Sequence, residues 1–364
     1  MKILHVLYSG LGGHGNVFFS MVDANGNNEF EFAALYNGIE PVREEYIRKC
    51  NEKGIPWYYV KKKPGLDIGY YLKLYRTIKK DCPHVIFLHG GAAALPAKLA
   101  KLTSTGIKKI IVRETQANHL KTKIDWLYLA TAMLVGDKMV YLSTYYKEQV
   151  QAKLGWLYKE KDSVVIPNGI NLDTFQKNSV EPNASQFLLG MQSRLISIKD
   201  HLTLLDAFAM VLKKELPVKL HLLIAGDGEF KEILIKHTAS LNIQDKVTFT
   251  GILEEKDLVQ FLQKLDIYIH ASLGETMSTA IMQAMACAKS IIASDVPGIN
   301  NMIKQNRTGL LVPAKNAEAL CDAILQLIND RQLCAVLADN AFTFAIENYS
   351  NKKMLQRYNE IFCD

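Results

Sequence analysis

The sequence lacks several features that mark other classes of protein. Its six cysteines are scattered without paired spacing, which argues against a disulfide framework and against a zinc site. Its longest apolar run, residues 127–135, is far shorter than the roughly 20 residues that cross a bilayer. The first residues enter a strand pattern directly, without the apolar core and cleavage site of a signal peptide. We therefore expect a cytoplasmic protein with reduced cysteines and no transmembrane helix.

The composition is that of a folded globular protein. Apolar residues make up 49% and charged residues 22% of the 364 residues, and no low-complexity tract or short repeat is visible. A chain of this length can bury two separate hydrophobic cores. The composition therefore argues against disorder and favours two domains.

Positive charge is concentrated in the first half of the chain. Residues 1–172 contain 24 Lys and Arg against 15 Asp and Glu, whereas the remaining residues contain 19 against 22. Such an excess attracts nucleic acid, anionic lipid headgroups or a phosphorylated acceptor, or it is a solvated lysine-rich surface. We expect no nucleic-acid partner and a peripheral, salt-reversible contact with an anionic membrane. The candidate contacts are Lys61, Lys62, Lys63, Lys98, Lys101, Lys108 and Lys109.

Short apolar runs alternate with longer amphipathic stretches in both halves, which is the pattern of parallel βα units. A linker fits best at residues 167–185, where prolines and polar residues gather. The sequence therefore predicts two doubly wound α/β domains, residues 1–172 and 173–344, and a helical C-terminal stretch at 345–364. The predicted strands are residues 3–8, 30–35, 57–60, 85–88, 110–112, 138–142, 163–166, 186–191, 220–225, 247–250, 267–270, 290–294 and 310–312.

The segment from residue 274 to residue 286, GETMSTAIMQAMA, is the most informative motif. It combines a turn that carries Glu275 with an apolar, small-residue helix, and it follows a predicted strand. A carboxylate beside the amides of a helix N-terminus suits a ligand with both sugar hydroxyls and phosphate, because the amides and the helix dipole favour anions. The motif predicts a nucleotide sugar as ligand. The alternative is an ordinary buried helix, since Ala and Met at helical spacing are typical of a core.

A second motif, residues 191–201, follows the first predicted strand of the second half and carries Arg194 and Lys199. Two cations on one strand-to-helix connection can converge on a diphosphate, with Arg binding two oxygens at once and Lys acting as a point charge. Surface cations are also common without any ligand. Gly226 and Gly228 end the next predicted strand, where ligands of open α/β sheets bind.

The first half contains weaker motifs. The glycines of residues 8–15, with Gly12 and Gly13 as candidates, let backbone amides approach a ligand, although their spacing is not the dinucleotide fingerprint. The alternative for this loop is a tight turn without a ligand. His89 ends a predicted strand before a glycine turn. Residues 113–116, after the next predicted strand, either bind an acceptor or form a buried ion pair.

Together these motifs resemble the signature of the retaining glycosyltransferases of family 4, the glycosyl transferases group 1. In that family a Glu, seven residues and a second Glu precede Ala-Met-Ala, and here the two positions are Glu275 and Gln283. The family's Gly-Phe-Gly is replaced by residues 276–278. The Arg194 and Lys199 segment matches Gly-Arg-Leu, four residues and Lys-Gly, with Ser and Asp for the glycines. The resemblance covers most of the second half and, thinly, the first.

The resemblance implies the GT-B fold, with two Rossmann-like domains facing across a cleft and the C-terminal helix packed back on the first. It implies a retaining, hexosyltransferase-like enzyme that uses a nucleotide sugar, with a UDP-sugar favoured over a GDP-sugar, and no cofactor. The basic residues of the first half add the expectation of a polyprenyl or other lipid-linked acceptor, or a glycan, in surface polysaccharide or glycolipid synthesis at the inner membrane face. The chain has no Asp-x-Asp pair, which argues against the metal-dependent single-domain design and predicts no metal site.

The resemblance also assigns roles to residues. Arg194 and Lys199 would stabilise charge on the leaving diphosphate, Glu275 would orient the donor sugar, and His89 would position it. Gln283 would touch the ribose. The other donor-binding candidates are Gly12, Gly13, Gly226, Gly228, Thr276, Met277, Ser278 and Thr279.

Two alternatives share the fold. One is a catalytically weak nucleotide-sugar-binding protein, because a Gln in place of Glu at position 283 loses a charged hydrogen bond of about 1.5 to 3 kcal/mol. The other is a nucleotide-sugar epimerase. Incubation with a panel of sugar nucleotides separates them from a transferase.

Overall fold

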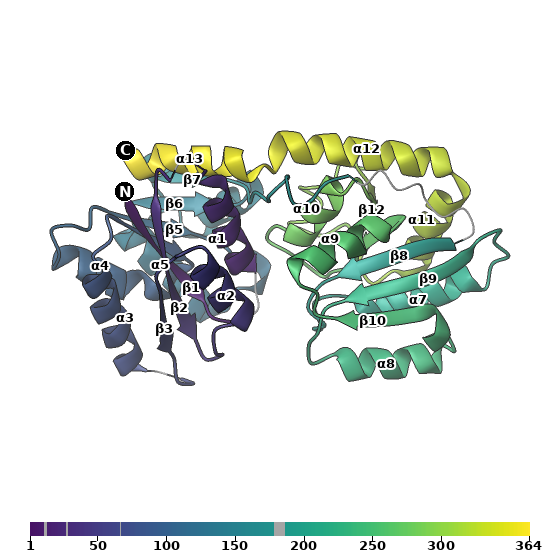
Figure 1. Cartoon of the computed structure of the whole chain (residues 1–364), viewed down its shortest axis with the longest axis horizontal. Helices are drawn as coiled ribbons and strands as arrows, with labels where there is room; N and C mark the ends of the chain where they lie inside the picture. The colour runs from purple at the N-terminus through teal and green to yellow at the C-terminus, as the bar shows by residue number, and fades with distance from the viewer. Residues whose placement is uncertain (11–12, 27, 66, 178–185) are drawn as a thin grey trace. The chain divides into compact units, whose positions relative to one another are not determined.

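The computed structural model describes residues 1–10, 13–26, 28–65, 67–177 and 186–364 (Figure 1). Two of the sequence predictions therefore lie partly or wholly outside the described residues: the linker predicted at residues 167–185, of which 178–185 are not described, and Gly12. The chain divides into two compact units. Unit 1 comprises residues 1–171 together with 351–364, and unit 2 comprises residues 172–350.

Unit 1 is built on a parallel sheet whose seven strands run in the order β3-β2-β1-β4-β5-β6-β7. Successive residues of β1 face opposite sides of the sheet, so Ile3 and Leu7 belong to one core and Leu4 and Val6 to the other. The strands are β1 (Lys2–Tyr8), β2 (Glu31–Gly38), β3 (Trp57–Lys61), β4 (Val85–His89), β5 (Lys109–Arg113), β6 (Lys138–Tyr141) and β7 (Ser163–Val165).

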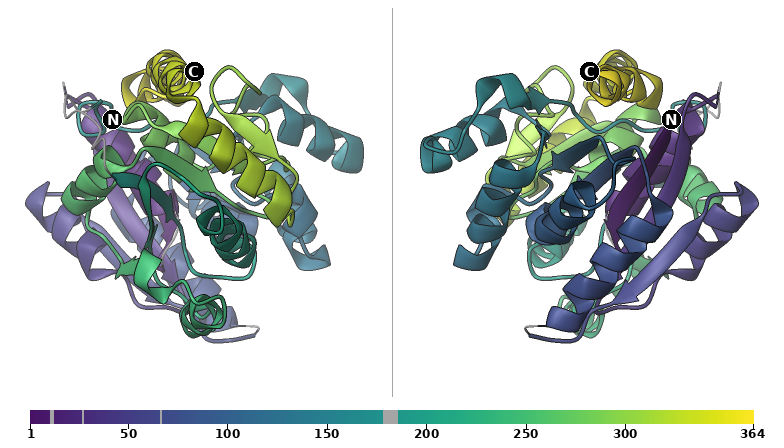
Figure 2. Two further views of the ribbon diagram at one scale, coloured as in Figure 1. Left: turned by 90° about the vertical axis from the view of Figure 1, so that its right-hand side faces the viewer. Right: turned by 90° about the vertical axis from the view of Figure 1, so that its left-hand side faces the viewer.

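Helices cover both faces of this sheet. One face packs against α1 (Gly13–Ala24), α2 (Glu44–Glu52) and α13 (Asn351–Cys363). The opposite face packs against α3 (Ile68–Asp81), α4 (Ala94–Leu102), α5 (Lys123–Val135) and α6 (Thr144–Leu154). In Figure 1, α3 and α4 lie along the outer left edge of unit 1, and the right-hand view of Figure 2 looks at unit 1 from that side.

Unit 2 repeats the plan with six parallel strands in the order β10-β9-β8-β11-β12-β13. The strands are β8 (Gln186–Gln192), β9 (Lys219–Ala225), β10 (Val247–Gly251), β11 (Ile267–His270), β12 (Ser290–Ser294) and β13 (Leu310–Val312). The helices are α7 (His201–Leu212), α8 (Lys231–Ser240), α9 (Glu255–Lys264), α10 (Thr279–Ala286), α11 (Ala317–Asn329) and α12 (Arg331–Asn348).

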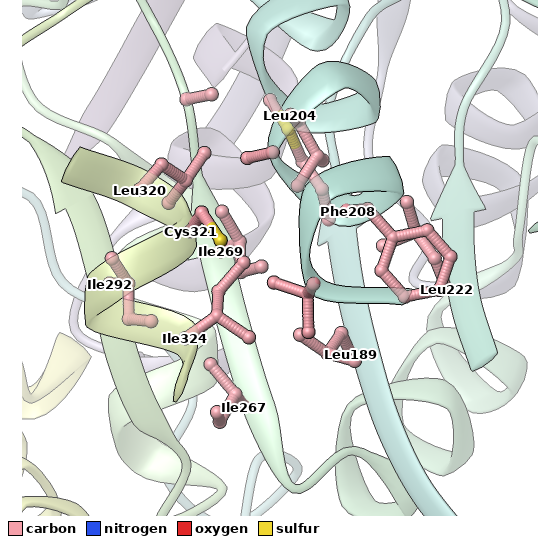
Figure 3. Close-up of a cluster of buried hydrophobic side chains, with 14 of the residues drawn as sticks. Leu189, Leu204, Phe208, Leu222, Ile267, Ile269, Ile292, Leu320, Cys321 and Ile324 are labelled. Atoms are coloured by element: carbon pink, nitrogen blue, oxygen red, sulfur yellow. The ribbon is translucent and has the colours of Figure 1, made fainter. Parts of the chain in front are cut away.

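The core of unit 2 lies between the sheet and two helices that pack against each other, α7 and α11 (Figure 3). Phe208 of α7 and Ile324 of α11 are fully buried there, against strand residues such as Leu189 and Ile269. These side chains recur at helical spacing in α7 and α11 and at alternating positions in the strands, which is why the pattern of apolar residues predicts both kinds of element.

The strand orders place a topological switch point in each sheet. The first strand of each unit, β1 or β8, lies between the strand that follows it in sequence and a strand reached by a longer crossover, β4 or β11. Loops at the carboxyl ends of such neighbouring strands leave in opposite directions and leave room for a ligand. The thirteen strands lie within three residues of their predicted bounds, so the predicted fold of two doubly wound parallel sheets is confirmed.

The C-terminal stretch, predicted to be helical at residues 345–364, is two helices rather than one. Helix α12 ends at Asn348, and α13 begins at Asn351 as part of unit 1. Asn351 is buried; its backbone N–H donates to the carbonyl of Ile170 at 3.0 Å and its side-chain amide to that of Ser20 at 3.0 Å. These bonds anchor the first turn of α13 on unit 1 and explain why the helix restarts there.

Candidate active site

The turn after β11 holds Glu275 in a fixed backbone position. Its N–H donates to the carbonyl of Pro297 at 3.2 Å. Gly298 has a φ of 85°, and a Cβ atom there would lie 1.9 Å from the carbonyl oxygen of Glu275, so only glycine fits. Ser278 ends the turn and caps α10, because its Oγ accepts from the N–H of Ile281 at 3.4 Å.

Glu275 lies at the centre of a largely buried cluster of charged and polar groups. Its Oε1 forms an ion pair with Lys199 Nζ and lies 2.9 Å from Nε2 of His270. The side chain of Lys199 is 11% exposed, that of Glu275 17% and that of His270 1%. Ser278 Oγ lies 3.3 Å from the same His270 nitrogen. The structure thus brings Lys199, from one predicted motif, together with Glu275 and Ser278, from the other.

His270 is a member of this cluster that the sequence analysis did not single out. Burial, helped by the charge of Lys199, holds its pKa well below the usual range, so the ring is neutral. Since a carboxylate only accepts hydrogen bonds, the proton lies on Nε2. Nδ1 lies 3.1 Å from the Tyr268 hydroxyl, which also donates to the carbonyl of Gln192 at 3.2 Å. The available signal was its place at the end of β11, immediately before the Glu275 turn.

Lys199 is poised to change its protonation state. Burial, with a smaller effect from the neighbouring charge of Arg194, lowers its pKa from 10.5 to about 7. Its contact with the Glu275 carboxylate acts in the opposite direction. An arriving diphosphate would favour the charged ammonium form, so the site would take up a proton on binding an anion.

Arg194 lies on an exposed turn directly after β8. This turn is held by backbone bonds from Ser193 N–H to the Ala225 carbonyl and from Leu195 N–H to the Asp227 carbonyl, each 3.0 Å long. Gly226 has a φ of 136°, and a Cβ atom there would lie 1.8 Å from the carbonyl oxygen of Ser193. The structure gives this glycine a role in the close approach of two loops, and its contact with a base stays a prediction.

His201, at the start of α7, joins the Arg194 turn to Lys199. Its Nε2 lies 3.0 Å from Ser193 Oγ, and its Nδ1 lies 2.6 Å from the carbonyl oxygen of Lys199. Burial lowers its pKa to about 4, so the ring is neutral near pH 7. It therefore ties the two cations to one rigid backbone arrangement without adding a charge.

The remaining predicted residues of unit 2 differ in their surroundings. Gln283 on α10 is 5% exposed, and its Oε1 has no hydrogen-bond partner among the described residues. A buried carbonyl without a partner costs about 1 to 3 kcal/mol, which a ligand hydroxyl would offset. Gly228 packs its Cα against the backbone of Leu195. Thr276 and Met277 are partly exposed on the Glu275 turn, and Thr279 is partly exposed at the start of α10.

In unit 1, both ring nitrogens of His89 are engaged by other side chains. Its Nδ1 lies 3.1 Å from Nη1 of Arg113, and its Nε2 lies 3.0 Å from Nδ1 of His5. Arginine only donates, so Nδ1 accepts and Nε2 carries the proton. Burial and the Arg113 charge keep the pKa of His89 well below its usual range. The predicted contact with a donor sugar therefore requires the ring to exchange one of these partners.

Residues 113–116 were predicted either to bind an acceptor or to form a buried ion pair, and their contacts in the structure bear on this choice. Arg113 is 2% exposed and donates to Oδ1 of Asn168, as well as to His89. Glu114 forms a buried ion pair with Lys121 at 3.2 Å. The buried ion pair is therefore present, but it is formed by Glu114 rather than by Arg113. Gly13, the described member of the glycine pair, is exposed at the start of α1.

Within the described residues, no group of three or more His, Cys, Asp and Glu side chains is placed to hold a metal ion. No described helix is long and apolar enough to cross a membrane.

Two family models match adjacent parts of the chain. The Glycosyltransferase Family 4 model matches residues 11–174, and the Glycosyl transferases group 1 model matches residues 173–344. The chain belongs to the family 4 glycosyltransferases. The predicted family is thereby confirmed, and the Glu275 turn, the Arg194 turn and Lys199 all lie in the group 1 part of this family 4 chain.

Curated relatives share local stretches of sequence. An uncharacterized glycosyltransferase of Methanocaldococcus jannaschii is 32% identical over 152 residues, which is 42% of this chain and 38% of the relative. An alpha-monoglucosyldiacylglycerol synthase of Streptococcus pneumoniae is 30% identical over 162 residues, 44% of this chain and 36% of the relative. These alignments span less than two fifths of the relatives' length.

Solved structures share the whole fold. An Anabaena HepE structure in complex with UDP and glucose superimposes with a TM-score of 0.83 at 19% identity, covering 100% of this chain and 99% of that one. A glycosyltransferase of Rickettsia africae gives a TM-score of 0.83 at 22% identity, covering 99% of this chain and 97% of that one. The likeness shows that this family 4 chain has the GT-B fold.

The pKa of Lys199 predicts that nucleotide binding depends on pH. Between about pH 7 and 9, UDP binding should weaken by up to about tenfold per pH unit, because the neutral amine must take up a proton to bind the anion. Calorimetry in two buffers of different ionisation enthalpy measures both the affinity and the proton uptake. Lys199→Arg keeps its charge and should give a flatter profile. If UDP affinity depends on pH equally in the parent protein and in Lys199→Arg, Lys199 is not the group that takes up the proton.

The unpartnered oxygen of Gln283 predicts a second effect on UDP affinity. Gln283→Glu should tighten binding by up to about tenfold, because a carboxylate accepts stronger hydrogen bonds from ribose hydroxyls. Gln283→Met has a similar length and no acceptor oxygen, so it should weaken binding by about tenfold. Calorimetry with UDP tests both variants. If neither changes the affinity while both remain folded, Gln283 does not contact the nucleotide.

Proposed function

We propose that this chain transfers a hexose from a UDP-sugar to a glycan or lipid-linked acceptor, with retention of anomeric configuration and without a metal ion or other cofactor. The observation that carries the proposal is the cluster of Lys199, Glu275 and His270 beside the Arg194 turn. It lies where β8 and β11 end, at the switch point of the unit 2 sheet. A largely buried lysine and an exposed arginine next to an oriented carboxylate suit a ligand that carries both phosphate and sugar hydroxyls.

The choice of UDP is supported by what similar structures contain. The Anabaena HepE structures hold UDP, UDP with glucose, or UDP-glucose. A Staphylococcus aureus TarM structure also contains UDP, at a TM-score of 0.78 and 13% identity. The donor is therefore proposed to be a UDP-sugar.

The cluster can exchange partners when the donor binds. In the structure Glu275 is shared between Lys199 and His270. If the donor diphosphate takes Lys199, the carboxylate is released to accept hydrogen bonds from sugar hydroxyls, while the neutral His270 continues to donate to it. Glu275 would thus hold the sugar. The two cations, Lys199 and Arg194, would hold the phosphates.

The proposed reaction needs no side-chain nucleophile. The bond between the anomeric carbon and the diphosphate oxygen breaks with its electron pair leaving on the phosphate, and the acceptor oxygen bonds to the anomeric carbon from the same face. The acceptor proton passes to the leaving phosphate. Arg194 and Lys199 would stabilise the charge that grows on the departing UDP.

A lipid-linked acceptor is supported by charge and by the names of relatives. The excess of Lys and Arg in residues 1–172 suits anionic headgroups or a phosphorylated acceptor. The Streptococcus relative is named for a glucosyldiacylglycerol product, and an Escherichia coli relative, 20% identical over 82% of this chain and 80% of the relative, for a diphosphoundecaprenol acceptor. We place the proposed reaction at the cytoplasmic face of a membrane, in glycolipid or surface polysaccharide synthesis.

The proposal predicts strong and similar effects of the two cations on turnover. Arg194→Ala and Lys199→Ala should each lower kcat by about 100-fold or more, because each removes a preorganised charge from the leaving diphosphate. Lys236→Ala changes an exposed lysine of α8 and serves as the control. Initial rates with the preferred donor measure the effect. Turnover equal to that of the control in both variants would remove the phosphate-binding assignment.

Incubation with a panel of sugar nucleotides, in the presence of EDTA, tests the reaction class and metal independence together. We expect slow release of UDP from one donor, transfer with unchanged anomeric configuration by NMR, and no loss of rate on chelation. A new sugar nucleotide would indicate an epimerase, and binding without reaction would indicate a binding protein. Activity lost with EDTA and restored by Mn²⁺ would contradict a metal-independent mechanism.

A further inference from the structure

Helices α3, α4 and α5 form one layer on the same face of the unit 1 sheet. Helix α4 packs against both of its neighbours. The inward sides of all three helices share one core, with Leu74 from α3, Ala97 from α4 and Leu129 from α5 among its members. Because the three inward sides face the same sheet, the three outward sides share one surface of unit 1 (Figures 1 and 2).

Large aliphatic side chains line this outward surface. Leu95, Leu99 and Leu102 of α4 are 57%, 54% and 71% exposed, and their spacing of four and three residues places them along one side of the helix. The surface also includes two residues of α3 and three of α5. We call the set the helical apolar face: Ile68, Leu72, Leu95, Leu99, Leu102, Ile124, Leu127 and Leu134.

The α5 part of the helical apolar face is uncharged along its length. Ile124, Leu127 and Leu134 are between 62% and 64% exposed. Thr131 lies between them on the same side, and its hydroxyl is bonded to the carbonyl of Leu127 at 2.9 Å, so its polarity is partly hidden. Exposed leucines are normal when scattered singly, but aligned rows on adjacent helices mark a surface that another apolar phase covers.

The charges around the helical apolar face are almost all positive. Exposed Lys and Arg side chains follow the apolar residues of α3, and α4 contains no acidic residue. The single acidic residue of α5, Asp125, is used in the capping box with Thr122, and that of α3, Asp81, is buried against Lys2. Asp67, which precedes Ile68, caps α3 by accepting from the N–H of Tyr70 at 3.0 Å. The basic residues of the three helices are Lys73, Arg76, Lys79, Lys80, Lys98, Lys101 and Lys123.

This charge complements anionic lipid headgroups and disfavours a second copy of the same surface. Two copies meeting through the helical apolar face would bring these lysines and arginines against each other, at a cost in like-charge repulsion. An anionic bilayer instead offers phosphates to the cations and acyl chains to the leucines. The observations therefore favour a bilayer as the occupant.

We propose that the helical apolar face is a membrane-docking surface, which inserts its leucine and isoleucine side chains into the headgroup boundary of an anionic bilayer. This inference rests on the proposed function only in that it expects an acceptor in a membrane. It revises the contact expected from lysines alone: Lys101 is held by Asp137 at 2.6 Å and Lys109 by the carbonyl of Ile361 at 2.8 Å. Apolar insertion makes part of the binding insensitive to salt.

Vesicle flotation of the full chain without nucleotide tests the surface separately from catalysis. The parent protein should bind vesicles of phosphatidylcholine and phosphatidylglycerol and keep part of this binding at 1 M salt, where charge interactions reach only about 3 Å. Leu99→Glu combined with Leu127→Glu should weaken binding by about tenfold or more, because buried aliphatic area is replaced by charge facing anionic lipid.

A matched control places the same changes elsewhere. Ile233→Glu combined with Val336→Glu alters side chains of unit 2 that are 47% and 48% exposed, and this variant should bind like the parent. Circular dichroism checks that both double variants are folded. UDP release from the donor in solution should be equal in both, so a failure of the proposed catalytic function is distinguishable from a failure of docking.

Three results would overturn the docking surface. The first is equal vesicle binding by the Leu99 and Leu127 double variant and the parent. The second is complete loss of parent binding at high salt, which would leave the lysines as the only contact. The third is a parent dimer in the absence of lipid that the same double variant converts to a monomer, because the occupant would then be a second copy of this chain.

Discussion

The candidate site of unit 2 depends on backbone contacts at the carboxyl edge of its sheet. Gly226 and Gly298 let two pairs of loops approach so closely that a single Cβ atom would collide with a carbonyl oxygen. One contact fixes the turn that carries Arg194, and the other fixes the turn that carries Glu275. Because these turns are held by main chain rather than by long side chains, the charged groups are positioned before any ligand arrives.

The two units stabilise buried positive charge in different ways. In unit 2, Lys199 is paired with a carboxylate, and its pKa is low because burial and, to a smaller extent, the charge of Arg194 favour the neutral amine. In unit 1, Arg113 is almost fully buried and donates to neutral acceptors on His89 and Asn168. An arginine keeps its charge under such conditions, whereas a lysine can lose a proton. Unit 1 therefore holds a permanent cation and unit 2 a cation that responds to a ligand.

The positive charge of residues 1–172 is also of two kinds. Some cations are consumed by the fold, as in the pairs of Lys121 with Glu114 and Lys101 with Asp137. Others lie exposed on α3 and at the start of α5, or partly exposed on α4, beside leucines that have no cover in the described structure. A count of charges cannot separate the two kinds, because the distinction depends on which elements pack against each other.

The sequence by itself determined the thirteen strands, the two doubly wound sheets and the motifs at the strand ends, because apolar spacing reports directly which side of an element is buried. The resemblance carried by residues 274–286 together with the segment of Arg194 and Lys199 was enough to name the family. Only the tertiary structure decided that Lys199 and His270 contact the same carboxylate oxygen of Glu275, which lies 76 residues from Lys199 along the chain. It also decided that both nitrogens of His89 are occupied and that the C-terminal stretch is two helices. These results depend on contacts between segments that are distant in the sequence. The spacing of apolar residues shows which face of an element is buried, but not which other segment packs against that face.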